Sequence, residues 1–143
     1  MRIELLGPAV IALALILVPA SANLVELLGD WHNIDSRTRG LVRIVIAEAG
    51  GAITVHPWGA CHPDPCDWGT VKATLYAPDI DTALPAGAQY LLAEFTTSFS
   101  TTMLIISPAA GSKGQLSVIS MGRFTDWRRH SKSNHALTEL FAR

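Results

Sequence analysis

The chain has 143 residues, a length typical of one domain, and a formal net charge of −1 at pH 7. This near-neutral balance creates no overall field that would attract nucleic acid, so the composition argues against a nucleic-acid-binding protein. The mean hydropathy of +0.29 is high for a soluble domain, and the first segment accounts for part of it.

Residues 1–22 have the three parts of a secretory signal peptide. Arg2 lies in the n-region, the uncharged run 9–18 forms the h-region, and Ala20 and Ala22 match an A-x-A cleavage site. The apolar run is shorter than the ~20 residues that a membrane-spanning helix needs. We therefore expect an N-terminal signal helix that is removed from a secreted or periplasmic protein.

The mature chain, residues 23–143, is then expected to be a single domain without a membrane span. An uncleaved membrane anchor is the alternative, because Glu4 offsets the positive charge of the n-region.

From residue 23 onward, apolar and polar residues mostly alternate, and turn residues recur about every ten positions. Alternation with a period of two is typical of strands that bury one face. Gly50-Gly51 is a two-glycine hairpin signal between two such strands. Residues 27–33 open the domain with the first strand. Further strands are predicted at residues 41–48, 52–55, 70–76, 89–95, 101–107, 115–121 and 134–143.

Short strands joined by turns predict an all-β fold, either a sandwich or a small antiparallel up-and-down β-barrel of about eight strands. We favour the barrel because closure removes exposed strand edges. Leu137, Leu140 and Phe141 also have helical spacing, so the last segment could be a helix. We predict a strand there because an eighth strand would close the barrel.

Residues 56–69 form the most distinctive stretch, with both cysteines and two of the four tryptophans. An even pair of cysteines in an exported protein predicts a disulfide between Cys61 and Cys66. Pro63 and Pro65 restrict the enclosed loop further. The main effect of so small a ring is to fix the shape of the loop.

The functional interpretation of this loop is a ligand-binding rim. Trp58 and Trp68 offer flat apolar faces, and His56, His62 and Asp67 offer hydrogen-bonding groups. This combination suits sugars or heterocycles, which need a stacking surface beside fixed polar groups. The alternative is structural, with both tryptophans packed in the core.

Metal binding and catalysis have less support. The cysteines and histidines, with Asp64 or Asp67, could provide zinc ligands, but one exported cysteine pair suits a disulfide better. The sequence has no Gly-x-Ser-x-Gly, no His-Glu-x-x-His, no phosphate loop and no dinucleotide fingerprint. We therefore predict a protein that is not an enzyme and that holds no metal or cofactor.

Two charged clusters remain. Arg39 or Arg43 is expected to pair with Asp35 or Asp67 and brace one end of the barrel. Residues 123–132 are basic, which is typical of a solvated loop. Weak attraction to an anionic surface polymer is the functional alternative for that run.

The segment Gly29-Asp30-Trp31-His32-Asn33 resembles the opening of the calycin superfamily of avidins and lipocalins. The resemblance implies that the tryptophan plugs the closed end of a barrel. We expect Arg39 or Arg43 beside it, because the arginine-bearing strand follows directly.

A longer pattern resembles a family of uncharacterised small bacterial secreted proteins that carries no established activity. Trp127-Arg128-Arg129 stands where small turn residues are expected. The matching residues are Trp31-x-Asn33-x-Asp35, Thr38-Arg39-Gly40, Arg43, His56-x-Trp58-Gly59-x-Cys61-His62-Pro63, Cys66-Asp67-Trp68-Gly69 and Arg123-Phe124-Thr125-Asp126.

These observations predict an exported β-barrel that binds a small molecule or a carbohydrate at its tryptophan-rich loop. The alternative is a structural or interaction module that contacts protein or polymer and whose barrel is filled by side chains. A barrel of about eight strands is at the size where either outcome is physically possible.

Overall fold

The structure is a computed structural model that describes residues 24–126, 128 and 131–143. The expected signal helix and its cleavage site lie outside the described residues. No helix among the described residues has the length and apolar character needed to cross a membrane.

The described residues form one antiparallel sheet and a short helix, α1 (Leu24–Leu27). The all-β fold class predicted from the alternation is therefore confirmed. The strands are β1 (Gly29–Asn33), β2 (Leu41–Ala49), β3 (Ala52–Gly59), β4 (Cys66–Asp67), β5 (Val71–Lys72), β6 (Thr74–Tyr76), β7 (Tyr90–Thr96), β8 (Ser100–Pro108), β9 (Gln115–Phe124) and β10 (His135–Ala142).

The last segment is a strand rather than a helix. β10 pairs along its whole length with β9, and its end pairs with β1 through His32↔Ala142 and Asn33↔Phe141. The first and last strands along the chain, β1 and β10, are thus neighbours in the sheet. Apart from β5, each remaining pair of neighbours in the sheet consists of strands that follow one another in the chain.

The prediction of a closed barrel is wrong. The hydrogen-bonded order of the strands runs from β4 through β3, β2, β1, β10, β9, β8 and β7 to β6, so the sheet has two ends. The predicted strand 70–76 is divided: β5 pairs with β3, and β6 pairs with β7. Between them, the N–H of Ala73 donates to the carbonyl of Ile53 at 2.8 Å. The segment therefore joins the two ends in succession and never pairs on both sides at once.

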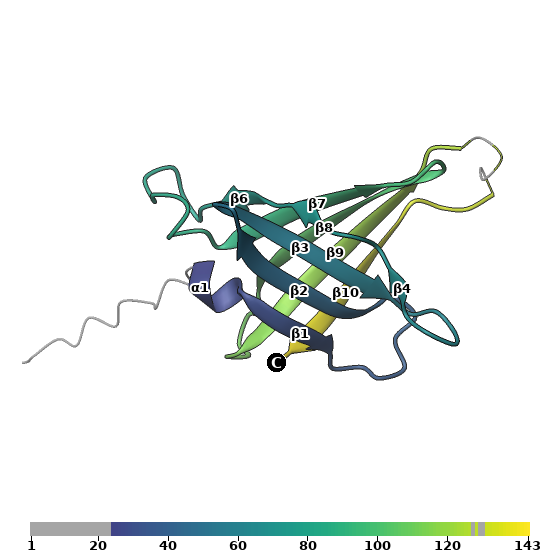
Figure 1. Cartoon of the computed structure of the whole chain (residues 1–143), viewed down its shortest axis with the longest axis horizontal. Helices are drawn as coiled ribbons and strands as arrows, with labels where there is room; N and C mark the ends of the chain where they lie inside the picture. The colour runs from purple at the N-terminus through teal and green to yellow at the C-terminus, as the bar shows by residue number, and fades with distance from the viewer. Residues whose placement is uncertain (1–23, 127, 129–130) are drawn as a thin grey trace, which may run out of the picture.

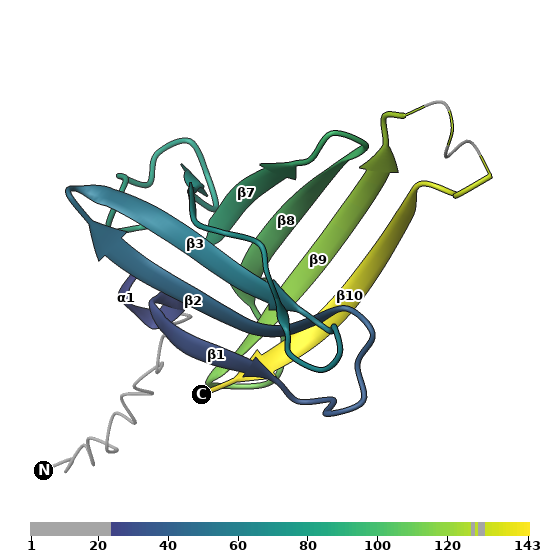
Figure 2. The same cartoon turned by 45° about the vertical axis from the view of Figure 1, so that its right-hand side comes forward.

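The sheet is strongly curved, with β1–β3 lying across β7–β10 (Figures 1 and 2). One continuous hydrophobic core fills its inner side, and α1 adds Leu24 and Leu27 to this core. The core is built by alternation, since every second residue of the long strands points inward. Ile53 and Val55 in β3 are buried in this way.

The β2–β3 hairpin shows one confirmed turn and one irregularity. Gly50 and Gly51 both have positive φ, 58° and 79°, which the two-residue turn requires. A shift in register between Leu41 and Arg43 changes the face of the residues before it. As a result Leu41 is buried, and Val42 lines an outer groove.

Trp31 anchors one end of the core and is 1% exposed. Its indole N–H donates to the carbonyl of Leu27 at 3.0 Å. The arginine beside it is Arg143, whose guanidinium lies 4.1 Å from the ring centroid. The expectation of Arg39 or Arg43 at this position is wrong, because Arg43 sits on the outer face of β2 and the antiparallel return of β10 brings the chain end back to β1.

Candidate functional site

The two tryptophans of the central loop lie on opposite faces of the sheet. Trp58 is on the outer face of β3, between the buried Pro57 and Gly59. Trp68 follows β4 and packs on the inner side, with its ring centroid 5.7 Å from that of Phe95. Its indole nitrogen would be 2.9 Å from a Cβ placed on Gly59, so a larger residue at Gly59 would displace the ring. Trp68 is 37% exposed. The structure therefore does not bring Trp58 and Trp68 together on one rim.

The Trp58 ring is held between neighbouring side chains on the outer face. His56 is two residues earlier on the same strand, and the two rings stack with centroids 3.9 Å apart and planes 16° apart. Arg43 is the cross-strand partner of Trp58, and its guanidinium lies 4.7 Å from the ring centroid. The distance is within the range of a cation–π contact.

A carboxylate holds the histidine at one end of this stack. His56 Nε2 and Asp67 Oδ1 are 2.5 Å apart, and the Gly69 N–H donates to the same oxygen at 2.7 Å. The Gly69 hydrogen bond lowers the pKa of the Asp67 carboxyl, and the His56 hydrogen bond lowers it further. The predicted site residues His56, Trp58 and Asp67 therefore form one connected group.

A second carboxylate holds the arginine at the other end. Asp30 accepts two hydrogen bonds from Arg43, at 2.8 and 2.6 Å, in a bidentate pair. This pairing lowers the pKa of the Asp30 carboxyl. The expectation that Arg43 pairs with Asp35 or Asp67 is wrong, because Asp30 lies on the adjacent strand and on the same outer face.

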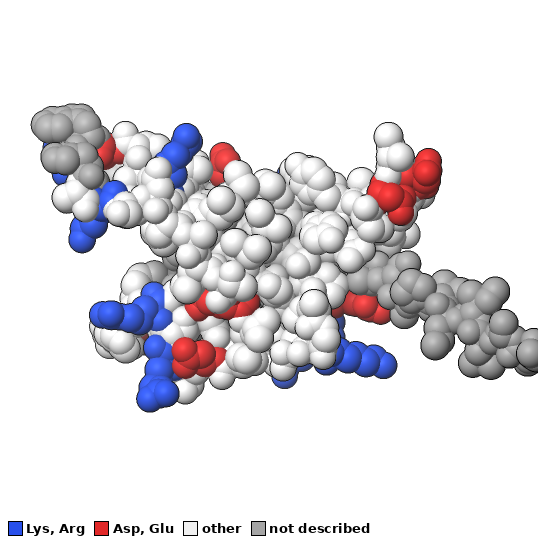
Figure 3. All heavy atoms as spheres, turned by 180° about the vertical axis from the view of Figure 1, so that it is seen from behind, with Lys and Arg blue, Asp and Glu red and all other residues white. Residues whose placement is uncertain are grey.

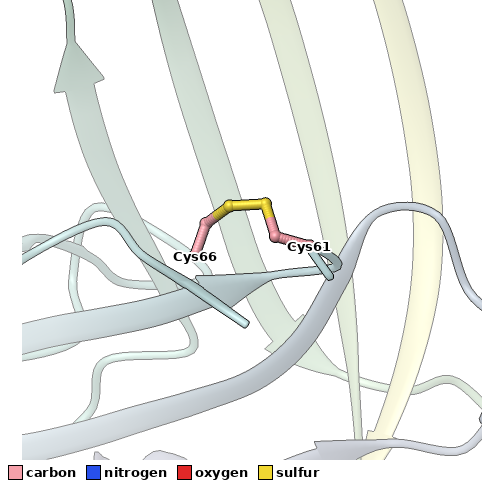
Figure 4. The surroundings of a disulfide bond; sticks show 2 residues. All are labelled: Cys61 and Cys66. Atoms are coloured by element: carbon pink, nitrogen blue, oxygen red, sulfur yellow. A yellow bond between two sulfur atoms is a disulfide. The ribbon is translucent and has the colours of Figure 1, made fainter. Parts of the chain in front are cut away.

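Cys61 and Cys66 form the predicted disulfide (Figure 4), with their Cα atoms 5.4 Å apart. The bond closes the connection between β3 and β4 and leaves His62 exposed within it. Both sulfurs are consumed by this bond, which removes them as zinc ligands. Within the described part of the chain, no three His, Cys, Asp or Glu side chains are placed to hold a metal ion.

Two open grooves border Trp58 and the disulfide loop. The smaller, of about 420 Å³, is lined by His32, Arg43 and Trp58. The larger, of about 730 Å³, lies between residues 36–39 of the β1–β2 connection and residues 60–63 of the disulfide loop. Val42 and Pro65 line both, so the two grooves adjoin.

Sequence reasoning missed a buried carboxylate behind the larger groove. Glu139 on β10 is 9% exposed and accepts hydrogen bonds from Asn33 Nδ2 at 2.8 Å, from the Leu41 N–H at 3.0 Å and from the Thr38 hydroxyl. Its carboxylate fills the space that a side chain at Gly40 would need. The signal was present, because the alternation His135, Leu137, Glu139, Phe141 places a charged residue on the inner face.

This network fixes the backbone of the β1–β2 connection. The Asp35 N–H donates to Asn33 Oδ1 at 2.8 Å, and the Arg37 N–H donates to Asp35 Oδ1 at 2.9 Å. At the end of the connection, the Ala60 N–H donates to the carbonyl of Gly40 at 2.8 Å. Arg37 and Arg39 are thus carried by a pinned loop. Arg39 lines the larger groove instead of pairing with Asp35 or Asp67.

Comparisons of the chain with protein-family models, with curated proteins and with solved structures found no match. The resemblances to calycins and to small bacterial secreted proteins therefore stay predictions. The function has to be argued from the geometry of the site.

Proposed function

We propose that the protein is an exported binding module that takes a carbohydrate or another small molecule in the groove beside Trp58. The observation that supports this most is an aromatic ring fixed in the wall of an open groove. His56 and Arg43 hold the ring, and each of them is held in turn by a carboxylate.

A ring held in this way favours binding for an energetic reason. Immobilising a side chain on binding costs roughly 0.5–1.5 kcal/mol, and this cost falls when the side chain is already ordered. Carbohydrates combine apolar ring faces with many hydroxyl groups, and the groove offers Trp58 beside His32 and Arg43. Apolar contact with the part of the ring that lines the groove and hydrogen bonds to the polar groups would then act together.

The disulfide is compatible with an oxidising compartment, which supports export. Protein recovered from the exported fraction should then begin at Asn23, after cleavage at the A-x-A site. Sequencing of the mature N-terminus checks this. A mature chain that begins at Met1 would support the anchor instead.

A screen of an oligosaccharide array and a metabolite panel tests the proposed function. Trp58→Ala should weaken the binding of any hit from several-fold to about tenfold, the range expected when one aromatic contact is lost. Trp68→Ala is the matched control, because that ring lies on the other face of the sheet. Binding that survives Trp58→Ala and fails in a folded Trp68→Ala variant would move the site to the inner side.

The alternative function, an interaction module, is favoured by a different surface. The outer face of β8 and β9 carries the cross-strand pairs Met103↔Met121 and Ile105↔Ile119, and Met121 is 48% exposed. Figure 3 shows the side opposite to Figure 1, where much of the surface belongs to residues other than Lys, Arg, Asp and Glu. Sedimentation of wild type and Met121→Glu would detect association through this face.

A further inference from the structure

We propose that the ligand of the two adjoining grooves is a negatively charged oligosaccharide. Its carboxylate or sulfate groups are bound by Arg37 and Arg39, which line the larger groove. This inference rests on the proposed function, and it adds the chemical class of the ligand and two residues that recognise it.

The charge of the lining residues is entirely positive. Neither groove is lined by aspartate or glutamate, whereas three arginines and two histidines line them. The lining residues that carry these groups are His32, Arg37, Arg39, Arg43 and His62. An anion entering the groove therefore meets donors on both sides of it. The chain as a whole has a formal net charge of −1, so this concentration of positive charge is local.

The arginines differ in their partners. Arg43 is neutralised by its bidentate pair with Asp30. Among the described residues, neither Arg37 nor Arg39 has a carboxylate within ion-pair distance. The nearby carboxylate of Asp35 accepts a hydrogen bond from the loop backbone and does not line the groove. Two guanidinium groups are thus available to an external anion.

The loop that carries these two arginines is fixed before any ligand arrives. Thr38 lies between them and donates its hydroxyl to the buried Glu139. The Gly40 N–H donates to Thr38 Oγ1 at 2.9 Å, which closes the turn. A planar guanidinium on a fixed backbone suits bidentate binding of a carboxylate or a sulfate.

The groove would then divide recognition between its two parts. The part of the Trp58 ring that lines the groove provides an apolar contact for a sugar, and the loop that carries Arg37 and Arg39 fixes the acidic substituent. The adjoining lining at Val42 and Pro65 allows one oligosaccharide to reach both parts. Binding through exposed arginines weakens with ionic strength, because salt screens exposed charges.

The test measures binding of three probes to the full mature chain by titration calorimetry. Oligogalacturonate carries carboxylates, a heparin-derived oligosaccharide carries sulfates as well, and maltohexaose is neutral. The double variant Arg37→Gln/Arg39→Gln should weaken binding of an acidic probe by about tenfold or more. The matched control is Arg123→Gln/Lys132→Gln, which removes the same charge from β9 and from its connection to β10. Figure 2 shows that this end of β9 lies away from the β1–β2 connection.

The expected result is salt-sensitive binding of at least one acidic probe that the first double variant loses and the control double variant keeps. Comparison of the two acidic probes identifies the preferred anion. Equal losses in both double variants would overturn the inference, because they would show attraction to net charge alone. Binding of maltohexaose that needs Trp58 and not the arginines would overturn it and leave the proposed function standing. Binding of none of the probes or of the wider array would remove both.

Discussion

Glu139 shows how a single inward charge can organise a loop that is distant in sequence. Its carboxylate is nearly buried, and three donors from the β1–β2 connection and its flanking strands satisfy it. A buried polar group costs little when it is hydrogen-bonded and much when a partner is lost. Glu139 therefore links β10 to the loop of Arg37 and Arg39.

The first prediction concerns this carboxylate. Glu139→Gln places an amide NH₂ where an acceptor is needed, so the free energy of unfolding should fall by about 1–3 kcal/mol. Urea denaturation measures the change. Glu94→Gln, at an exposed position of β7, is the control and should leave stability almost unchanged. Equal denaturation midpoints for wild type and Glu139→Gln would show that the hydrogen bonds of Glu139 do not stabilise the fold.

The second prediction concerns the pH dependence of stability at Asp67. Its pKa is lowered in the folded state by Gly69 and His56, so folding favours the charged form. The stabilisation is present above the unfolded pKa of about 3.9 and is lost as pH falls through the lower folded value.

Denaturation midpoints measured between neutral and acidic pH check this. Wild type should lose more stability than Asp67→Asn as the solution is acidified below the unfolded pKa. Parallel curves for the two proteins would show that Asp67 gains nothing from its partners.

At this scale the sequence predicted the residue types of the site but not their arrangement. Trp58 and Trp68 look equivalent in the sequence because each precedes a glycine. Their faces differ because β4 returns beside β3 and pairs Asp67 with Trp58, which turns the next residue inward. The partner of Arg43 was missed for a related reason, since the register of β1 against β2 is not visible in the alternation of either strand.

Among the elements, the disulfide loop is the best predicted and the segment after it the least. Two cysteines behind an export signal predicted the bond, and the structure contains it. The alternation of residues 70–76 predicted one strand, whereas the structure divides it between β3 and β7. Alternation of apolar and polar residues indicates which face of a strand is buried, but it does not indicate with which strand each half of the segment pairs.

The third prediction tests the disulfide. Intact-mass measurement after alkylation should show no free thiol before reduction and two after it. Cys61→Ser/Cys66→Ser should lower the free energy of unfolding by about 2 kcal/mol, because the closed loop is short. Two alkylated cysteines in unreduced exported protein would contradict the bond.

For the whole molecule, the antiparallel sheet was predictable and its closure was not. The strands follow from alternation with a period of two, and the hairpin follows from the turn chemistry of two glycines. The burial of Trp31 was expected only from the resemblance of residues 29–33 to the calycin opening. Closure of the sheet requires that one strand pairs with both ends of the sheet at once. Here the joining segment has two short strands instead of one long one, so the ladder is interrupted.

The curved sheet also explains why the proposed site is on the outside. The inner side is occupied by one continuous core that runs from α1 through Trp31 and Phe141 to Phe95. The outer face of β1–β3 instead carries the fixed Trp58 stack and the adjoining grooves. Because Trp58 and Trp68 lie on opposite faces of the sheet, their two indole signals report separately on ligand binding at the outer and the inner face.

The most direct test of the outer site is an NMR titration that follows the indole N–H signals of the tryptophans. The ligand is the tightest-binding oligosaccharide of the array, added to the mature wild-type chain, with signals assigned by single Trp→Phe variants. If the ligand binds at the outer site, the indole N–H chemical shift of Trp58 changes with ligand concentration, and those of Trp31 and Trp68 do not. A shift of Trp68 with Trp58 unchanged would place the ligand on the inner side and contradict the account.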